Sequence, residues 1–395
     1  MTTRPCWVEI DTHALEENFR FLAEIATPHA ELLAVVKADA YGHGLALCAP
    51  AAVRAGARWL GVTSVEEGVE ARIVCPSARI LIMGGVFPGQ GVDVVRSQLT
   101  PSLWEPFQIA EIEEAARAAG LAPGSFPIHV EIDTGMSRQG VLPSCLATLL
   151  ASFGADSPLR IEGLMTHLFA ADEADERVTH EQLNRLDEAV RNLETSGHHA
   201  ELITAGATAA LLAGAAPAIA ALAARHGLRA ILRPGLAVYG LAPEFDPPFT
   251  GPEPAPLASA HQRLQPVLSW KTRITCLRSI EPGAVVGYNG TFVATEPMQI
   301  ALLPVGYADG LDRKLGNHFS VLVAGQRAPI IGRISMDQAT IDVTGIPGLA
   351  PGDEVVLLGT QGTETVSAFH HADASGTIPW EVFTRIAPRV TRRAV

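Results

Sequence analysis

Three segments near the start of the chain, LLAVVK at positions 32–37, WLGVT at 59–63 and RILIM at 79–83, set the pattern that decides the fold. Each is a short apolar run with the length of a β-strand, and a longer segment follows it in which Ala, Glu and Arg recur at helical spacing. Alternating strand and helix patterns are typical of parallel strands joined by helices. The sequence therefore predicts an α/β fold.

The same unit recurs along the chain as far as Arg233. The apolar runs lie at residues 32–37, 59–63, 79–83, 99–103, 128–133, 161–167, 200–204 and 229–233. Eight such runs fit an N-terminal (β/α)8 barrel of the TIM type, which takes roughly 250 residues. The fourth run is the weakest, because Pro101 lies inside it. An open, doubly wound sheet is the alternative topology.

A proline-rich segment separates this pattern from a different one. Six of the fourteen residues in 243–256 are proline, which is typical of a linker. Beyond it the apolar runs are short, as at 320–323, and turn sequences separate them. We therefore expect residues 1–250 to form the barrel and residues 251–395 to form a C-terminal, mainly β domain.

Composition narrows the class of function. The formal net charge of −13 offers no basic surface for nucleic acid and disfavours an anionic membrane, so we expect a small-molecule substrate. The start of the chain does not resemble a signal peptide, and glycine and proline interrupt the alanine-rich segment 205–224, so we expect a cytoplasmic protein without a membrane span. Five scattered cysteines, never in a Cys-x-x-Cys pair, predict reduced thiols and no metal site.

Catalytic groups of such barrels lie at the carboxyl ends of the strands. The polar residues that close or follow the apolar runs are Lys37, Asp133, Arg138, His167, Thr208 and Arg233. Lys37 leaves a buried strand, and burial lowers the pKa of a lysine, which suits a Schiff-base lysine. The alternative is that its stem lies along the barrel wall and its ammonium group reaches water.

Six blocks of sequence extend these observations to nearly the whole chain, from Trp7 to Val390. They are KADAYGHG (37–44), DTGMSRQG (133–140), MTHL (165–168), RPGLAVYGL (233–241), VGYADG (305–310) and GRISMDQ (332–338). In this order the blocks resemble those of the alanine racemase family of fold-type III pyridoxal-phosphate enzymes, and six ordered blocks are far more specific than any one of them.

The resemblance implies a reaction and an assembly. Lys37 would carry pyridoxal 5'-phosphate through a Schiff base and act as one of two bases that interconvert L- and D-alanine. The other base would be Tyr307, supplied by the partner subunit of a homodimer whose active sites are shared. Two bases on opposite faces are what inversion at a carbon requires. The family's product, D-alanine, implies a role in supplying a cell-wall peptidoglycan precursor.

The resemblance also implies the contacts of the cofactor. Thr208, Gly235 and Leu236 would hold its phosphate, and Tyr41 would reach the same group. Arg233 would meet the pyridine nitrogen, which stays unprotonated because a guanidinium does not readily give up its proton. From the residues alone, Arg233 could instead form an ion pair at the barrel end.

The substrate pocket follows in the same way. Arg138 would lie near the phenolic oxygen of the cofactor or the substrate carboxylate. His167 would hydrogen-bond Tyr307 of the partner subunit, although a histidine at a strand end is as often structural. Met336 and Asp337, again from the partner, would line the pocket.

Three positions depart from the family's pattern. Glu131 stands where the family commonly has a lysine that can be carbamylated, and its negative charge permits an ion pair with Arg138. In the block GATAA at 206–210, Thr208 keeps a hydroxyl for the phosphate, but Ala207 lacks the usual amide. Trp380, which we expect near the cofactor, replaces a tyrosine with a larger side chain that donates but cannot accept a hydrogen bond.

These departures leave other functions open. The preference of the racemase could shift to serine or another small amino acid. The chain could also be a non-catalytic pyridoxal-phosphate-binding protein of the same fold type, although such proteins lack a C-terminal β domain. A decarboxylase of basic amino acids shares both domains, but the cysteine-centred signature of that class is absent from the sequence.

Overall fold

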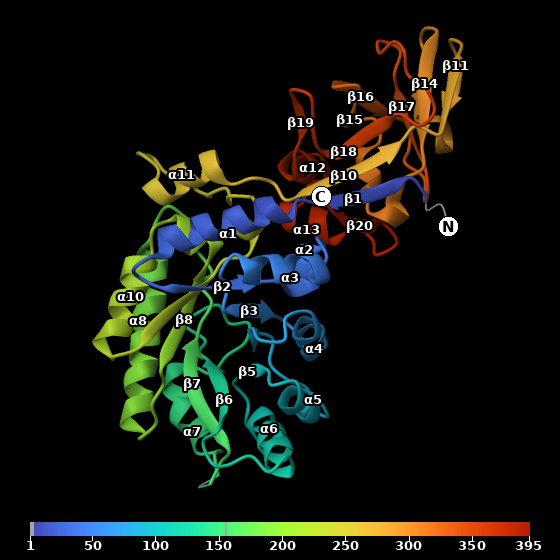
Figure 1. Cartoon of the computed structure of the whole chain (residues 1–395). Helices are drawn as coiled ribbons and strands as arrows, with labels where there is room; N and C mark the ends of the chain where they lie inside the picture. Colours follow the sequence, from blue (N-terminus) through green and yellow to red (C-terminus); the bar gives the residue numbers. More distant parts are fainter. Residues whose placement is uncertain (1–3, 155) are drawn as a thin grey trace. The chain divides into compact units, whose positions relative to one another are not determined.

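The computed structural model describes residues 4–154 and 156–395. It divides into two compact units, which are described separately here and drawn together in Figure 1. The barrel unit comprises His13–Ala40 and Cys48–Gln265. The β unit comprises the described part of Met1–Thr12 together with Tyr41–Leu47 and Pro266–Val395.

Eight parallel strands of the barrel unit close into a barrel in the order in which they occur along the chain. They are β2 (Glu31–Val35), β3 (Trp59–Val62), β4 (Arg79–Ile82), β5 (Thr100–Leu103), β6 (Phe126–Glu131), β7 (Leu159–Met165), β8 (Leu202–Ala207) and β9 (Arg229–Arg233). Each lies within or overlaps one predicted run, so the predicted barrel is confirmed. The open sheet is excluded, because β2 pairs with β9 through Leu32 and Leu232.

The doubtful fourth run does form a strand, β5, despite Pro101. Only two residues of β5 pair with each neighbouring strand, and Pro101 lies opposite Ile82 of β4. A residue in a parallel ladder donates to one neighbour only, so a proline here removes a single hydrogen bond. The strand is therefore short but retained.

Helices connect the strands. The longer ones are α1 (Thr12–Ala26), α3 (Leu45–Arg54), α4 (Val65–Val74), α6 (Pro106–Ala118), α8 (Arg177–Thr195), α10 (Ala216–Arg225) and α11 (Ala255–Arg263), and the shorter ones are α2 (Lys37–Tyr41), α5 (Gly91–Arg96), α7 (Leu146–Leu150) and α9 (Thr208–Leu212). In Figure 1, α4, α5 and α6 lie on one side of the barrel strands and α8 and α10 on the other. Helix α8 buries Leu183, Leu186, Val190 and Leu193 along one face, as an amphipathic helix on a barrel should.

The alanine-rich segment 205–224 forms the end of β8 and most of α9 and α10. No helix among the described residues has both the length and the hydropathy needed to cross a membrane.

The β unit is built on one ten-stranded sheet, which confirms the mainly β character predicted for the C-terminal part. The strand order is β11, β14, β17, β16, β15, β18, β10, β1 and β20, with β19 added beside β18. The strands are β1 (Cys6–Ile10), β10 (Leu268–Arg273), β11 (Cys276–Ile280), β14 (Met298–Leu303), β15 (Ser320–Val323), β16 (Gln326–Ile331), β17 (Ala339–Asp342), β18 (Glu354–Gln361), β19 (Glu364–Val366) and β20 (Thr391–Ala394). A separate hairpin of β12 (Val285–Val286) and β13 (Phe292–Val293) and two helices, α12 (Ala368–Ser375) and α13 (Pro379–Thr384), complete the unit.

The last segment of the barrel unit ends at Gln265, and the C-terminal segment of the β unit begins at Pro266. The sequence places this boundary earlier, between residues 250 and 251. Helix α11 follows the proline-rich segment yet packs in the barrel unit, where Arg263 bonds Glu24 at 2.8 Å and its guanidinium lies 4.2 Å from the centre of the Phe21 ring. The N-terminal strand β1 belongs to the β unit instead, because it pairs with β10 and β20. The sequence places residues 1–12 in the barrel; residues 4–12 belong to the β unit instead, and residues 1–3 lie outside the described part of the chain.

The segment after Lys37 adopts a left-handed helical turn. Ala38, Asp39, Ala40 and Tyr41 all have φ between 52° and 54°. Residues other than glycine avoid this region, at a cost of roughly 1–2 kcal/mol each, so the turn is held by its surroundings and not by its own preference. Such strain is typical of functional sites.

The strain in this turn predicts how a substitution at the exposed residue Ala38 changes the stability of the protein. Ala38→Gly should raise the free energy of unfolding by about 0.5 kcal/mol, since relief of roughly 1–2 kcal/mol of strain outweighs roughly 0.5–1 kcal/mol of added chain entropy. Ala221→Gly, at an exposed position of the right-handed helix α10, is the matched control and should lower it by about 1 kcal/mol. Urea unfolding measures both, and equal losses would show that the turn at Ala38 is unstrained.

Candidate active site

Lys37 lies just beyond the carboxyl end of β2, where it is the first residue of α2, and its side chain is half-buried. Burial lowers the pKa of its amine, and the positive charges of Arg138 and Arg233 lower it further against the opposing charge of Glu67. The amine is thus biased toward the neutral, nucleophilic form.

The chain has three lysines, and the other two are engaged elsewhere. Lys271 forms ion pairs with Glu9 at 2.9 Å and Glu354 at 3.1 Å. Lys314 donates from Nζ to the backbone oxygen of Ser375 at 2.8 Å. Lys37 is the lysine whose amine has a lowered pKa.

A residue that sequence reasoning missed, Glu67, holds the backbone next to Lys37. Its Oε1 accepts from the amide of Ala38 at 2.5 Å, and its Oε2 accepts from the amide of Thr63 at 2.8 Å. Glu67 is also the third residue of α4, where it forms a capping box with Ser64. The Ser-x-x-Glu pattern at 64–67 is a recognisable signal for that helix start, but nothing in it indicates a bond to Ala38.

Arg233, the last residue of β9, is buried with part of its guanidinium unused. Its Nη2 donates to the backbone oxygen of Thr166 at 2.7 Å and lies 3.4 Å from Nδ1 of His167. Its Nη1 is buried and has no hydrogen-bond partner. Burial lowers the pKa of Arg233 to about 10, so the group is still protonated at neutral pH. An unpartnered buried donor of this kind needs an acceptor.

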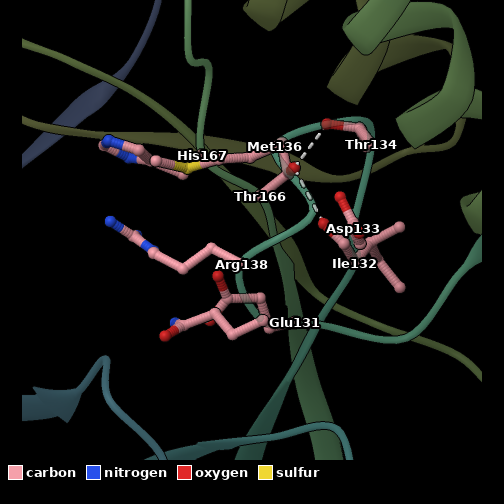
Figure 2. A pocket seen from close by; sticks show the side chains of 9 residues that line it. Glu131, Ile132, Asp133, Thr134, Met136, Arg138, Thr166 and His167 are labelled. Carbon is pink, nitrogen blue, oxygen red and sulfur yellow. Dashed lines mark hydrogen bonds between the residues drawn. The ribbon is translucent and has the colours of Figure 1, made fainter.

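A pocket opens at the carboxyl ends of β6 and β7, and Figure 2 shows its lining. The lining residues are Glu131, Ile132, Asp133, Thr134, Met136, Arg138, Gln139, Thr166 and His167. Thr134 and Thr166 share a hydroxyl hydrogen bond of 2.7 Å, and Thr166 also donates to the backbone oxygen of Ile132 at 2.9 Å. Asp133 accepts from the amides of Gly135 and Ser137, which shapes the loop that carries Arg138.

Two titratable groups in this pocket have strongly shifted pKa values. Burial, together with the positive charges of Arg233, Arg138 and Lys37, lowers the pKa of His167 to about 3, so its imidazole is neutral at physiological pH. Burial raises the pKa of Glu131 to about 7, although a hydrogen bond from Gln139 Nε2 at 2.7 Å and the charges of Arg233 and Arg138 limit the rise. No direct bond joins Glu131 to Arg138 among the contacts of the described residues.

The residues expected around a phosphate gather at the ends of β8 and β9. Thr208 begins α9, and its hydroxyl oxygen accepts from the amides of Gly235 at 3.0 Å and Ala237 at 3.3 Å. Leu236, between these two amides, begins a short 3-10 turn. Ala207, which ends β8, pairs with Arg233 of β9. The fold thus brings Thr208, Gly235 and Leu236 together, whereas Tyr41 belongs to the β unit, and the role of these residues in holding a phosphate stays a prediction.

The remaining predicted site residues belong to the β unit. The amides of Tyr307 and Ala308 donate to the backbone oxygens of Ser335 and Met336, both at 3.0 Å, so two of the six sequence blocks, 305–310 and 332–338, are hydrogen-bonded to each other. The side chains of Tyr307 and Met336 are exposed on this unit. Trp380, in α13, is half-buried, and Tyr41 is buried, which raises its pKa to about 12.

Family profiles and known relatives match this chain over nearly its whole length. Residues 10–243 match the family profile "Alanine racemase, N-terminal domain", and residues 267–394 match "Alanine racemase, C-terminal domain". The chain is 37% identical to the alanine racemase of Halothermothrix orenii over 390 residues, which cover 99% of this chain and 97% of that protein.

Solved structures agree as well. The alanine racemase of Bacillus anthracis with bound L-Ala-P superposes with a TM-score of 0.84 at 30% identity and covers 100% of this chain and 96% of its own. That of Bartonella henselae with covalently bound pyridoxal phosphate superposes with a TM-score of 0.81 at 26% identity and covers 99% of both chains.

The shifted pKa of Glu131 predicts a pH-dependent stability. The folded protein binds this proton up to about pH 7, whereas an unfolded glutamate releases it near 4.5, so the free energy of unfolding falls as the pH rises between these values. Glu131→Gln should therefore stabilise the cofactor-free protein at pH 8, by at most about 3 kcal/mol, and far less at pH 5.

Urea unfolding at the two pH values measures this difference. Glu364→Gln, which alters an exposed carboxylate of the β unit, is the control and should change stability equally at both. If Glu131→Gln gave the same change at pH 5 and pH 8, the raised pKa of Glu131 would be wrong.

Proposed function

The chain belongs to the alanine racemase family, and on that premise we propose that it interconverts L- and D-alanine with Lys37 and Tyr307 as opposed bases and pyridoxal 5'-phosphate as cofactor. One observation carries the assignment of the site. Lys37 is a lysine of lowered pKa at the carboxyl end of a barrel strand, in the electrostatic field of Arg138 and Arg233.

The residues present fit the cofactor. When bound, pyridoxal phosphate withdraws electrons from the α-carbon of an amino acid attached to it and so eases removal of the α-proton. Arg233 has a buried Nη1 without a partner, which suits the acceptor nitrogen of a pyridine ring. Because Arg233 remains a cation, it donates to that nitrogen without protonating it, and this restrains side reactions such as transamination.

Anion binding is supported at two places in the barrel unit. Thr208, Gly235 and Leu236 lie at the ends of β8 and β9, the usual position of a phosphate in barrels of this kind. We assign Tyr41 to the same group from the resemblance alone. Arg138, exposed beside the pocket, presents a guanidinium fork that suits a carboxylate or a phenolic oxygen.

Proton transfer needs one base on each face of the α-carbon, because a single base that returns the proton to the same side restores the starting enantiomer. Lys37, biased toward its neutral form, serves one face. We assign the other face to Tyr307 of the partner subunit from the resemblance to the family; Lys37 and Tyr307 belong to different compact units of the chain. His167 is neutral and can hydrogen-bond a phenol in either direction.

The assembly is accordingly a homodimer with shared active sites. Met336 and Asp337 of the partner subunit line the substrate pocket in this assignment, and Trp380 lies near the cofactor. Because Trp380 is larger than the tyrosine it replaces, it bears on the range of small amino acids accepted. We further propose that the enzyme acts in the cytoplasm and supplies D-alanine for peptidoglycan precursors.

The first test concerns Lys37. The purified protein should absorb in the visible, and borohydride reduction should attach the pyridoxyl group to Lys37 and not to Lys271 or Lys314, as read by peptide mass spectrometry. Lys37→Ala should lose the band and slow racemisation of alanine by about a thousandfold or more. Lys314→Ala is the control and should keep both. A label on another lysine would contradict the assignment.

The second test concerns the shared site. Mixing inactive Lys37→Ala chains with inactive Tyr307→Phe chains yields heterodimers in which one site has both bases and the other has neither. Activity should return to about a quarter of the wild-type level when chains mix randomly at equal ratio and the sites act independently. Differently tagged chains establish that exchange has occurred. No recovery in proven heterodimers would mean that one chain supplies both bases.

A further inference from the structure

A fully buried carboxylate lies directly beneath the turn that carries Tyr307. Asp309 ends the 3-10 turn Tyr307–Asp309, and none of its surface is exposed. Its Oδ2 accepts from the amide of Gly306 at 2.9 Å, and its Oδ1 accepts from Nε of Arg389 at 2.7 Å. Arg4 forms a second ion pair with the same carboxylate. A buried carboxylate is costly unless it is paired in this way.

Arg389 also joins this turn to a second segment. Its Nη2 donates to Oδ1 of Asp337 at 2.8 Å, while Arg4 lies 3.6 Å from the same oxygen. The Arg389 guanidinium therefore bonds both Asp309, two residues after Tyr307, and Asp337, next to Met336, and Arg4 lies close to both carboxylates. The backbone bonds from Tyr307 and Ala308 to the 335–336 segment run alongside this bridge.

The backbone of the turn is closely packed against neighbouring segments, with no room for a side chain at the two glycines that flank it. A Cβ at Gly306 would overlap the carbonyl oxygen of Ser335, and a Cβ at Gly310 would overlap that of Arg385. Gly310 also has φ of 108°, a conformation that disfavours any other residue. The backbone of Ala387 donates to the backbone oxygen of Asp309 at 3.0 Å, which ties the turn to the segment that carries Arg389.

The side chain of Tyr307 is, by contrast, 43% exposed on the β unit. Packing within this unit covers only part of the ring, so the backbone of the turn is needed to fix where the phenol points. Proton transfer works only within hydrogen-bond reach, and a displacement of about 1 Å can cost a hundredfold in rate.

We propose that Asp309, clamped by Arg4 and Arg389, is a positioning residue that sets the placement of the Tyr307 phenol for proton transfer. The inference rests on the proposed function, because it presupposes that Tyr307 is one of the two bases. Asp309 touches neither substrate nor cofactor in this role. It acts through the backbone of Gly306–Asp309 and through the bridge to Asp337.

A positioning role differs from a merely structural one because its loss affects proton removal from the two alanine enantiomers unequally. Loss of the clamp should impair the base on the Tyr307 side and leave the base on the Lys37 side in place. It should therefore slow removal of the α-proton from the same enantiomer that Tyr307→Phe slows. A general loss of structure would slow both enantiomers together.

The experiment measures release of α-deuterium from each alanine enantiomer in single turnovers of the holoenzyme. Arg389→Gln removes the guanidinium that bonds both carboxylates within 2.8 Å, at a side chain that is 42% exposed, and Asp309→Asn removes the buried charge at constant shape. Arg327→Gln is the matched control, since Arg327 of the β unit is 46% exposed and bonds Glu364 from Nε at 2.8 Å. Visible absorbance of the cofactor and thermal melting accompany each variant.

We expect Arg389→Gln to slow one enantiomer, the one slowed by Tyr307→Phe, by roughly tenfold to a hundredfold, and the other by less than about twofold. Arg389→Lys should recover part of the loss, and Arg327→Gln should leave both rates unchanged. Asp309→Asn should show the same asymmetry; if it fails to fold, Arg389→Gln and Arg389→Lys decide the question.

The outcomes distinguish failure of the positioning role of Asp309 from failure of the two-base function. Asymmetric slowing by Tyr307→Phe with equal slowing, or none, by Arg389→Gln would overturn the positioning role and leave the proposed function standing. Equal slowing of both enantiomers by Tyr307→Phe would overturn the two-base function and, with it, this inference.

Discussion

The hydrogen-bonded closure of the barrel is the constraint on which the candidate site depends. Strand β2 pairs with β9 at Glu31 and Leu32, although about 200 residues of chain separate the two strands. Two further bonds reinforce this seam, from the amide of Val35 to the backbone oxygen of Pro234 at 3.1 Å and from the Tyr239 hydroxyl to the backbone oxygen of Val35 at 2.9 Å. Because parallel strands end on the same face, closure brings Lys37 and Arg233 into one electrostatic field.

The electrostatics of the barrel unit follow from that convergence. Arg138 and Arg233 act electrostatically on the Lys37 amine, and Glu131 is a buried acid in the same field. Burial, reinforced by the positive charges of neighbouring groups, lowers the pKa of Lys37 and keeps His167 neutral. The positive charges of Arg138 and Arg233 suit this site to a phosphate and a carboxylate.

The β unit presents the exposed side chains of Tyr307 and Met336 from a hydrogen-bonded sheet. Its sheet includes strands from both ends of the chain, with β1 between β10 and β20. The ion pairs of Asp309 reach Arg4 near one end and Arg389 near the other. Tyr307 and Met336 therefore stand on a framework to which both ends of the chain contribute.

The sequence by itself determined the strand pattern of the barrel, the mainly β character of the second unit and the residues at the strand ends, because hydrophobic periodicity is a local property. It also indicated Lys37, Arg138, His167, Thr208 and Arg233 as neighbours, since strand ends of a barrel share one face. Only the tertiary structure decided the left-handed turn at Ala38–Tyr41, the capture of β1 by the β unit and the clamp on Asp309. Aspartate visits positive φ only as an isolated residue and alanine rarely does, so the local sequence does not predict four such residues in a row, and the bond from Glu67 that supports this turn comes from another helix. Pairing among residues 4, 309, 337 and 389 depends on long-range contacts, which no local pattern encodes.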